Sequence, residues 1–157
     1  MDPGYDPAQA WPGTGRFDDG IEPTLYLANS PEGAVAEYLR RHPELFGLAL
    51  LVELWEIAVD VIKPALDLRG PIAQSTVGVR LDRLTSSDKN ELERYRECRA
   101  LMRDVISASL TGVLYPSAAL RTGERWNLVL RGSDGWTSAA TGQISPPSVA
   151  EGDVVVL

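Results

Sequence analysis

The chain has few of the side chains that build disulfides and zinc sites. It contains one cysteine, Cys98, and one histidine, His42, in 157 residues. A single cysteine excludes an internal disulfide, and one cysteine with one histidine argues against a zinc site of the usual kind. We therefore expect no bound metal, and this cysteine usage fits a reducing cytosol best.

Positive charge and long apolar runs are also scarce. Lys and Arg number 15 against 22 Asp and Glu, which leaves a formal net charge of −7. Proteins that bind nucleic acid without sequence preference present a basic face, so we expect no direct nucleic-acid partner. No apolar run approaches the roughly 18 residues of a membrane helix, and no export signal opens the sequence. We therefore expect a cytoplasmic protein without a membrane partner.

The rest of the composition is that of an ordinary globular domain. Hydrophobic residues make up 44% and charged residues 24% of the chain, which is typical of folded proteins. A chain of this length forms one domain that buries roughly two thirds of its unfolded surface. We divide it into an irregular arm at residues 1–15, the domain itself at 16–131, and a tail rich in Ser, Thr, Gly and Pro at 132–157.

Apolar and periodic segments predict both strands and helices. Strands are predicted at residues 24–28, 66–68, 113–115 and 126–130, and a helix that begins near residues 85–88 continues through Ile106. Residues 48–61 are long enough for a helix, but their alternation also fits a strand, which we prefer. Loops are predicted at 71–78 and 132–147, and 154–157 is compatible with an edge strand. This irregular order indicates an α+β domain with mixed or antiparallel sheets and flanking helices.

The helix predicted at residues 31–41 is the most informative segment. The Ser30 side chain can accept a free N–H of the first turn, and Pro31 loses no hydrogen bond at the first helical position. One face of this helix carries, at helical spacing, Ala34, Glu37, Tyr38 and Arg41. We expect that face to meet the core, where an ionised Glu37 needs a partner or a function. Pairing with Arg40 or Arg41 on the same helix is the structural alternative.

Two ordered blocks of sequence carry a resemblance to a known family. The first contains Gly15-Arg16-Phe17, Gly20, Tyr26-Leu27-Ala28, Ser30, Ala34 and Ala36-Glu37. The second contains Gly112-Val113-Leu114-Tyr115-Pro116-Ser117-Ala118 followed by Trp126-Asn127-Leu128-Val129-Leu130. On these residues the chain resembles the RES domain, a family named for an Arg, a Glu and a Ser.

The resemblance implies a fold similar to that of ADP-ribosyltransferases. It also implies the toxin half of a bacterial toxin–antitoxin pair that consumes NAD, with an Xre-like antitoxin as partner, in a homodimer or a hetero-oligomer with the antitoxin. Carried across residue by residue, the match implies an NAD site made by Arg16, Tyr26, Glu37 and Ser117, with Asn127 supporting the serine loop.

The residue types fit the cleavage of the bond between nicotinamide and ribose. Positive charge develops on the ribose as nicotinamide leaves, and the Glu37 carboxylate can stabilise it. Arg16 can hold a pyrophosphate through two parallel hydrogen bonds, and Tyr26 offers a flat face to nicotinamide. We expect Ser117 to donate a hydrogen bond rather than to act as a nucleophile, because no Gly-x-Ser-x-Gly elbow surrounds it.

Two other functions stay open at this point. One is the transfer of ADP-ribose to a protein target, since the residues do not select the acceptor. The other is a non-catalytic RES-like module that binds a partner or a nucleotide. Many members of the family open with an earlier strand bearing a further Arg, and no counterpart precedes Gly15. Asp18 also stands where members often have Asn.

Overall fold

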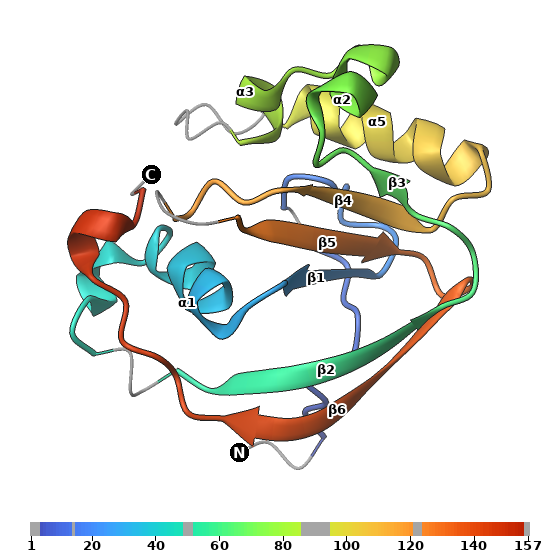
Figure 1. Ribbon diagram of the computed structural model, residues 1–157. Helices are drawn as coiled ribbons and strands as arrows, with labels where there is room; N and C mark the ends of the chain where they lie inside the picture. Colours follow the sequence, from blue (N-terminus) through green and yellow to red (C-terminus); the bar gives the residue numbers. More distant parts are fainter. Residues whose placement is uncertain (1–3, 14, 49–51, 86–94, 121–123, 156–157) are drawn as a thin grey trace.

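The computed structural model describes residues 4–13, 15–48, 52–85, 95–120 and 124–155, which form three layers (Figure 1). The middle layer is a sheet of four strands in the order β1 (Thr24–Ala28), β5 (Trp126–Arg131), β4 (Gly112–Pro116) and β3 (Leu66–Asp67). One face is covered by helices α2 (Pro71–Val77), α3 (Leu81–Leu84) and α5 (Arg96–Ser107). A two-stranded ribbon of β2 (Leu54–Val61) and β6 (Trp136–Ile144) lies on the other side.

The remaining helices lie at one end of the molecule, near the start of β2. Helix α1 (Pro31–Leu39) follows β1 directly, and the short 3-10 helices η1 (Pro43–Leu45) and η3 (Glu151–Asp153) lie near it (Figure 1). Over the described part of the chain, no helix has the length and apolar composition required to cross a membrane. Helices and strands alternate irregularly, so the predicted α+β class is confirmed.

The pairing of the central sheet brings distant parts of the chain together. β5 runs antiparallel to β1 on one side and to β4 on the other, which places Asn127 between Ala28 and Tyr115. Tyr26 lies opposite Val129 in the same sheet. Because alternate residues of a strand point to the same side, Tyr26, Asn127 and Tyr115 share one face. That face is the one covered by α5.

The main core fills the space between this face and α5. The ring of Phe17 lies 4.8 Å from that of Tyr115, and Cys98 is fully buried. Burial raises the pKa of the Cys98 thiol. The fully or nearly fully buried members of this core are Phe17, Leu68, Leu84, Cys98, Leu101, Met102, Val105, Val113, Tyr115 and Val129.

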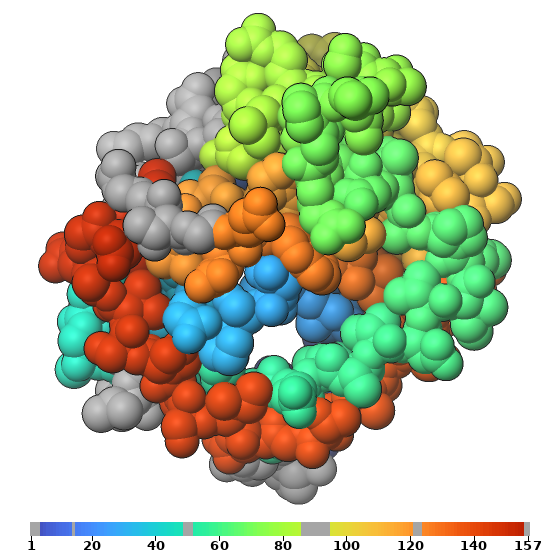
Figure 2. Space-filling view, viewed as in Figure 1, coloured from blue at the N-terminus to red at the C-terminus, as the bar shows by residue number. Residues whose placement is uncertain are grey.

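The β2–β6 ribbon packs against the central sheet through an apolar cluster near the start of β6. Trp136, the first residue of β6, packs with Leu25 and Leu130 in a second apolar cluster. Toward the other end, an opening passes through the molecule between β2 and the segment that holds β1 and α1 (Figure 2). Most side chains of β6 are exposed or half-exposed. Because an isolated pair of strands is marginally stable in water, we infer that the Trp136 cluster holds the ribbon in place.

Helix α1 begins where the sequence predicts. The Ser30 side chain accepts the Gly33 N–H at 3.0 Å, and Pro31 occupies the first turn. The helix ends at Leu39 with Arg40 as its C-cap, slightly before the predicted end. The start is therefore set by local chemistry, as expected.

The predicted core face of α1 was wrong. Tyr38 and Arg41 are exposed, whereas Val35, Ala36 and Leu39 are buried. Ala36 packs in a third cluster, whose other buried residues are Ala119 and Val154. The small side chains along this helix form no clear apolar stripe, so its periodicity could not identify the buried face.

Residues 71–78 were predicted to form a loop, but the structure places α2 there. Pro71 occupies the first turn, and Gly78 adopts a left-handed conformation at the C-cap, with φ of 71°. The Gln74 side chain donates to the Leu68 carbonyl at 2.8 Å inside the protein. Pro and Gly thus mark the two ends of a short helix here, whereas the sequence analysis took them as signs of irregular backbone.

The loop predicted at residues 132–147 was also wrong, because β6 fills most of it. β6 pairs with β2 from Leu54 opposite Ile144 to Val61 opposite Trp136, with an irregularity between Glu56 and Ile57. Ala139, Ala140 and Gly142 of β6 are residue types depleted in strands, and the pairing partner of β6 is far away in the sequence. The arm also reaches this ribbon, since the Ser138 hydroxyl donates to the Ala8 carbonyl at 2.7 Å.

Other predictions agree with the structure within a few residues. The strands predicted at 24–28, 113–115 and 126–130 are confirmed as β1, β4 and β5, and 66–68 contains β3. The strand predicted at 48–61 begins at Leu54, and residues 49–51 lie outside the described residues. The helix start predicted at 85–88 falls largely outside them too, while Thr85 is the C-cap of α3. At the C-terminus, Val154 forms a single bridge with Leu120.

Gly112 offers a test of the close packing between β4 and β5. A Cβ atom at Gly112 would lie 2.0 Å from the Val129 carbonyl oxygen, whereas one at Gly142 in β6 would meet nothing within 4 Å. We expect Gly112→Ala to lower the free energy of unfolding by about 3 kcal/mol, or roughly 6–12 °C in Tm. Gly142→Ala is the matched control and should leave Tm nearly unchanged. Equal Tm values for the two variants by thermal denaturation would contradict this packing.

Candidate functional site

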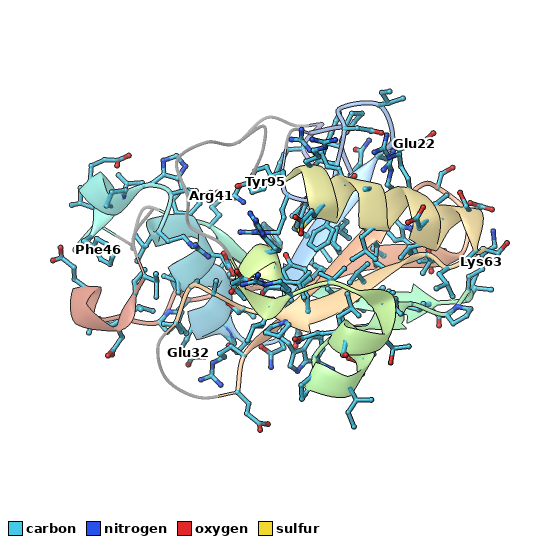
Figure 3. All side chains as sticks on the ribbon, turned by 90° about the horizontal axis from the view of Figure 1, so that it is seen from above. Glu22, Glu32, Arg41, Phe46, Lys63 and Tyr95 are labelled. Carbon is cyan, nitrogen blue, oxygen red and sulfur yellow. The ribbon has the colours of Figure 1, made fainter. Side chains whose placement is uncertain are left out.

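A polar pocket lies between α1, the central sheet and the start of α5. Its walls include three of the predicted site residues, Arg16, Tyr26 and Glu37. In the view from above, Arg41 after the end of α1 and Tyr95 before α5 lie on either side of the space between these helices (Figure 3). The complete set of described lining residues is Arg16, Tyr26, Glu37, Arg40, Arg41, Leu84, Tyr95, Tyr115 and Ala118.

Glu37 is held by hydrogen bonds from two other elements. Its Oε1 accepts from the Ser117 hydroxyl at 2.9 Å and from the Asn127 side-chain amide at 2.7 Å. Its Oε2 lies 3.7 Å from Arg40 Nη1, which makes a loose ion pair. Ser117 and Asn127 follow Glu37 by 80 and 90 residues in the sequence. The structure therefore brings all five predicted site residues to one place, three in the pocket wall and two behind Glu37.

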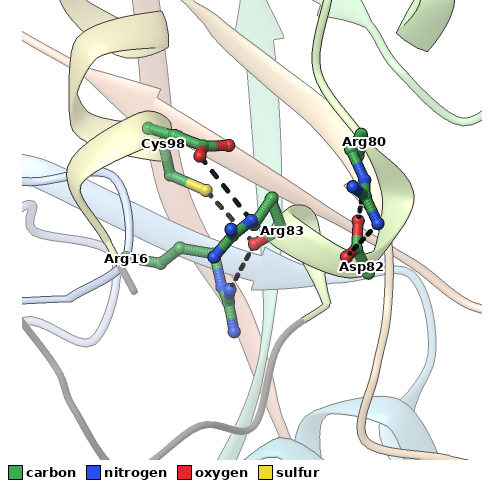
Figure 4. Close-up of polar contacts among 6 residues, drawn as sticks. Arg16, Arg80, Asp82, Arg83 and Cys98 are labelled. Atoms are coloured by element: carbon green, nitrogen blue, oxygen red, sulfur yellow. Dashed lines mark hydrogen bonds and ion pairs between the residues drawn. The ribbon is translucent and has the colours of Figure 1, made fainter. Parts of the chain in front are cut away.

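Arg16 is anchored on the opposite wall of the pocket. Its Nη1 donates to the Arg83 carbonyl at 3.0 Å, and the Cys98 thiol donates to the same oxygen at 3.6 Å (Figure 4). Its guanidinium also lies over the Tyr95 ring, 5.1 Å from the ring centre. Only 7% of Arg16 is exposed. These contacts fix the charge of Arg16 at the junction of α3 and α5.

Tyr26 organises the loop that carries Arg16. Its hydroxyl accepts the Phe17 N–H at 2.8 Å and donates to the Asp18 carboxylate. Burial raises the pKa of Tyr26, although 37% of the residue is exposed and Tyr26 lines the pocket. Gly15 packs against this hydroxyl, because a Cβ there would lie 2.8 Å from it. The ring of Tyr26 stays available to the pocket while its hydroxyl is used inside the protein.

The pocket carries an excess of positive charge. Among the described residues, its wall contains the cationic side chains of Arg16, Arg40 and Arg41 and one carboxylate, that of Glu37. Arg40 is 3% exposed, and burial lowers the pKa of its guanidinium, opposed by Glu37 and reinforced by Arg16 and Arg41. Such a pocket favours an anionic ligand. It stands out because the chain as a whole has a net charge of −7.

Several pocket residues were not identified from the sequence. Tyr95 and Tyr115 line the pocket and are almost fully buried, and Arg40 was considered only as an ion-pair partner of Glu37. Burial, and then the nearby Glu37 carboxylate, raise the pKa of Tyr115. In the sequence, Tyr95 lies among charged residues at the start of the helix predicted to continue through Ile106. An aromatic residue among these charges was the available signal, but it does not say what the ring packs against.

The hydrogen bonds of Ser117 suit the positioning of Glu37 more than covalent attack. The Ser117 hydroxyl donates to Glu37 and accepts the Ala119 N–H at 3.3 Å, so both of its roles are taken within the protein. The second oxygen of Glu37, Oε2, takes part in the loose ion pair with Arg40. Within the described residues, no group of three or more His, Cys, Asp or Glu side chains is arranged to hold a metal ion. The groups that the site offers are a positioned carboxylate, arginines and aromatic rings.

Comparison with known families places this geometry in context. The profile of the RES domain matches residues 2–147. Because the match spans nearly the whole sequence, the chain belongs to the RES domain family, as its ordered motifs predicted. A search of curated protein sequences returned no significant match.

A solved structure shares the fold. The chain is similar to one in the crystal structure of the M. tuberculosis MbcT–MbcA toxin–antitoxin complex, with a TM-score of 0.64 and 20% sequence identity. The similarity covers 92% of this chain and 79% of the other. At this level of identity the comparison establishes the fold alone, which is that of the α+β domain described above.

The buried pair of Asp18 and Tyr26 leads to a prediction about pH. Burial raises the pKa of Asp18 above its ordinary value of 3.8, and the hydrogen bond from Tyr26 lowers it again in part. We expect the Asp18 carboxyl to titrate above pH 3.8 in the folded protein, and higher still in Tyr26→Phe. The folded state then holds more protons than the unfolded state between the two pKa values. The contribution of Asp18 to stability therefore falls as pH rises through that interval.

The measurement is a carboxyl-carbon NMR titration of wild type and Tyr26→Phe. Asp82, whose side chain is largely exposed and pairs with Arg80, serves as the internal reference because Tyr26 does not contact it. A lower Asp18 pKa in Tyr26→Phe than in wild type would show that this hydroxyl does not stabilise the carboxylate.

Proposed function

We propose that this chain is a RES-domain toxin that degrades NAD by cleaving the bond between nicotinamide and ribose, and that an antitoxin protein neutralises it. The observation that carries the proposal is the Glu37 carboxylate, fixed by Ser117 and Asn127 beside a pocket rich in arginine. Membership of the RES family supports the same assignment. The reaction is expected to take place in the cytoplasm, where the substrate is abundant.

Glu37 is assigned the central chemical role. When nicotinamide leaves, its ring takes the electron pair of the broken bond and becomes neutral, while positive charge develops on the ribose. A carboxylate held next to that ring stabilises the charge more in the transition state than in the ground state. The two hydrogen bonds to Oε1 keep the group oriented without neutralising it. Its other oxygen can accept a hydrogen bond from a ribose hydroxyl.

The reaction is completed by an acceptor from solution. Attack of water on the ribose carbon yields ADP-ribose and releases one proton, whereas attack of inorganic phosphate yields ADP-ribose 1″-phosphate. In either case one carbon–nitrogen bond breaks and one carbon–oxygen bond forms. Neither reaction oxidises or reduces the substrate. The acceptor is therefore identified by the product.

The other predicted residues bind and orient the substrate in this proposal. Arg16, fixed over Tyr95, supplies positive charge to the pyrophosphate. The exposed ring of Tyr26 stacks on nicotinamide. Ser117 and Asn127 position Glu37, and once substrate is bound the Ser117 hydroxyl can share its hydrogen bond with a ribose oxygen.

The partner assignment rests on the fold and the family. A similar chain is part of a toxin–antitoxin complex, and the resemblance described above favours an antitoxin of Xre type. A protein that binds over the pocket would prevent substrate entry. Control by a partner suits an activity that would otherwise deplete a cofactor of the whole cell.

The first experiment follows NAD over time by NMR with purified protein, in buffers with and without phosphate. Glu37→Gln keeps an oxygen for Ser117 and Asn127 but removes the charge, so we expect NAD loss to slow by at least about 100-fold. Glu32→Gln, on the first turn of the same helix, is the matched control and should retain wild-type rates. Loss of NAD at the same rate in Glu37→Gln would rule out this role, and no NAD loss in wild type would rule out the activity.

The acceptor is read from the same samples. Free ADP-ribose identifies hydrolysis, and ADP-ribose 1″-phosphate identifies phosphorolysis. Transfer to a protein, the alternative raised by the sequence, would appear instead as label from adenine-labelled NAD on a protein band.

A second experiment tests the toxin assignment in bacterial cells. Expression of the wild-type chain is expected to arrest growth, because NAD is consumed, and Glu37→Ala or Arg16→Ala should relieve the arrest at equal protein levels. Circular dichroism of the purified variants checks that they fold. Arrest by both folded variants as severe as that by wild type would show that the toxicity does not come from this pocket.

A further inference from the structure

Arg40 stands apart from the other charged side chains of the protein. It is 3% exposed, and its Nε and Nη2 atoms are buried without a hydrogen-bond partner among the described residues. Its Nη1 lies 3.7 Å from Glu37 Oε2, beyond hydrogen-bond distance. A guanidinium has five N–H donors and is charged at all relevant pH values. Arg40 therefore lies inside the protein with most of its donors unused.

A buried guanidinium with unpaired donors destabilises the folded protein unless a ligand binds to it. Leaving a buried charged donor unpaired costs several kcal/mol, and folded proteins rarely tolerate this without a functional reason. The side chain is not needed to cap α1, because the backbone N–H of Arg40 makes the capping hydrogen bonds to Ala36 and Tyr38. The unused donors belong to a residue that lines the pocket.

The surroundings of Arg40 indicate the charge of the missing partner. Arg16 and Arg41 lie near enough for their charges to lower the pKa of Arg40, and Glu37 is the one carboxylate among the described residues of the pocket wall. Arg16 already donates to the Arg83 carbonyl and stacks on Tyr95. Arg40 has the donors to spare, and the net positive pocket requires an anion.

We propose that Arg40 binds the pyrophosphate of the substrate and thereby selects nucleotides that carry one. This inference rests on the proposed function for the identity of the substrate, but not for the anionic character of the site. The planar fork of a guanidinium matches two oxygens of a phosphate group, and the contact is strengthened by burial. Nicotinamide ribosides without phosphate are expected to bind poorly.

The position of Arg40 also fits the proposed chemistry. Arg40 follows Glu37 by three residues, and its Nη1 lies 3.7 Å from Glu37 Oε2. A phosphate held by Arg40 would therefore be close to the carboxylate to which we assign the cleavage of the bond.

The test uses ADP as the probe, because it carries a pyrophosphate and has no bond for the enzyme to cleave. Isothermal titration calorimetry compares ADP binding to wild type and to Arg40→Met. Loss of a charge-assisted bidentate contact is expected to weaken binding on the order of 10- to 100-fold. Tm of the free protein should stay unchanged or rise, because an apolar side chain replaces an unpaired buried charge. A structural role for Arg40 predicts the opposite, a lower Tm.

Arg80→Met is the matched control. Arg80 is largely exposed and pairs with Asp82 outside the pocket, so the variant loses the same charge without touching the site. ADP affinity and the rate of NAD loss should equal those of wild type. An equal loss of ADP affinity in both variants would mean that only overall charge matters, which overturns the proposal.

The remaining outcomes separate this inference from the proposed function. If Arg40→Met degrades NAD and has the same ADP affinity and KM as wild type, the role of Arg40 is overturned. The enzyme assignment then stays intact. ADP binding that depends on Arg40, without any NAD loss, retains the role and overturns the enzyme assignment. If Arg40→Met lowers Tm, the comparison is repeated with Arg40→Gln, and a lower Tm in both variants shows a structural role and overturns the proposal. Absence of ADP binding to the wild-type protein also overturns the proposal.

Discussion

The site depends on one carboxylate that three separate parts of the chain hold in place. Glu37 comes from α1, Ser117 from the turn after β4, and Asn127 from β5, and the two hydrogen bonds to Glu37 join them. A half-buried ionised group needs such partners, because the free energy of its lost hydration must be recovered from hydrogen bonds. The same bonds orient the carboxylate toward the pocket. The contacts that join α1 to the sheet therefore also position the carboxylate to which we assign the chemical role.

Around this carboxylate the protein gathers positive charge that its composition does not suggest. The chain is acidic overall, yet the pocket wall carries Arg16, Arg40 and Arg41. Each is held differently: Arg16 by a carbonyl and an aromatic ring, Arg40 by burial beside Glu37, and Arg41 at the exposed end of α1. Like charges repel, and the charges of Arg16 and Arg41 lower the pKa of Arg40, whereas the Glu37 carboxylate raises it. In our proposal a bound anion would relieve this repulsion.

The sequence analysis succeeded where a structure depends on residues close together in the chain. Ser30 and Pro31 start α1, and the apolar run from Trp126 forms β5, because capping and strand preference act over a few residues. The five candidate site residues were found through the order of family motifs, since no local rule connects Glu37 with Asn127 across 90 positions. Two loops were predicted in error, because the Pro and Gly around α2 and the Ser and Thr of β6 have more than one structural meaning.

By itself the sequence determined the class of the domain, the start of α1, the strands β1, β4 and β5, and the residue types offered to the site. Only the tertiary structure decided that β6 pairs with β2, that the Val35 side of α1 is buried, and that Arg40 lies in the pocket with unused donors. The first group follows from chemistry within a turn or a strand. The second depends on which surfaces meet, and the free energy of burial and pairing is set by residues far away in the chain.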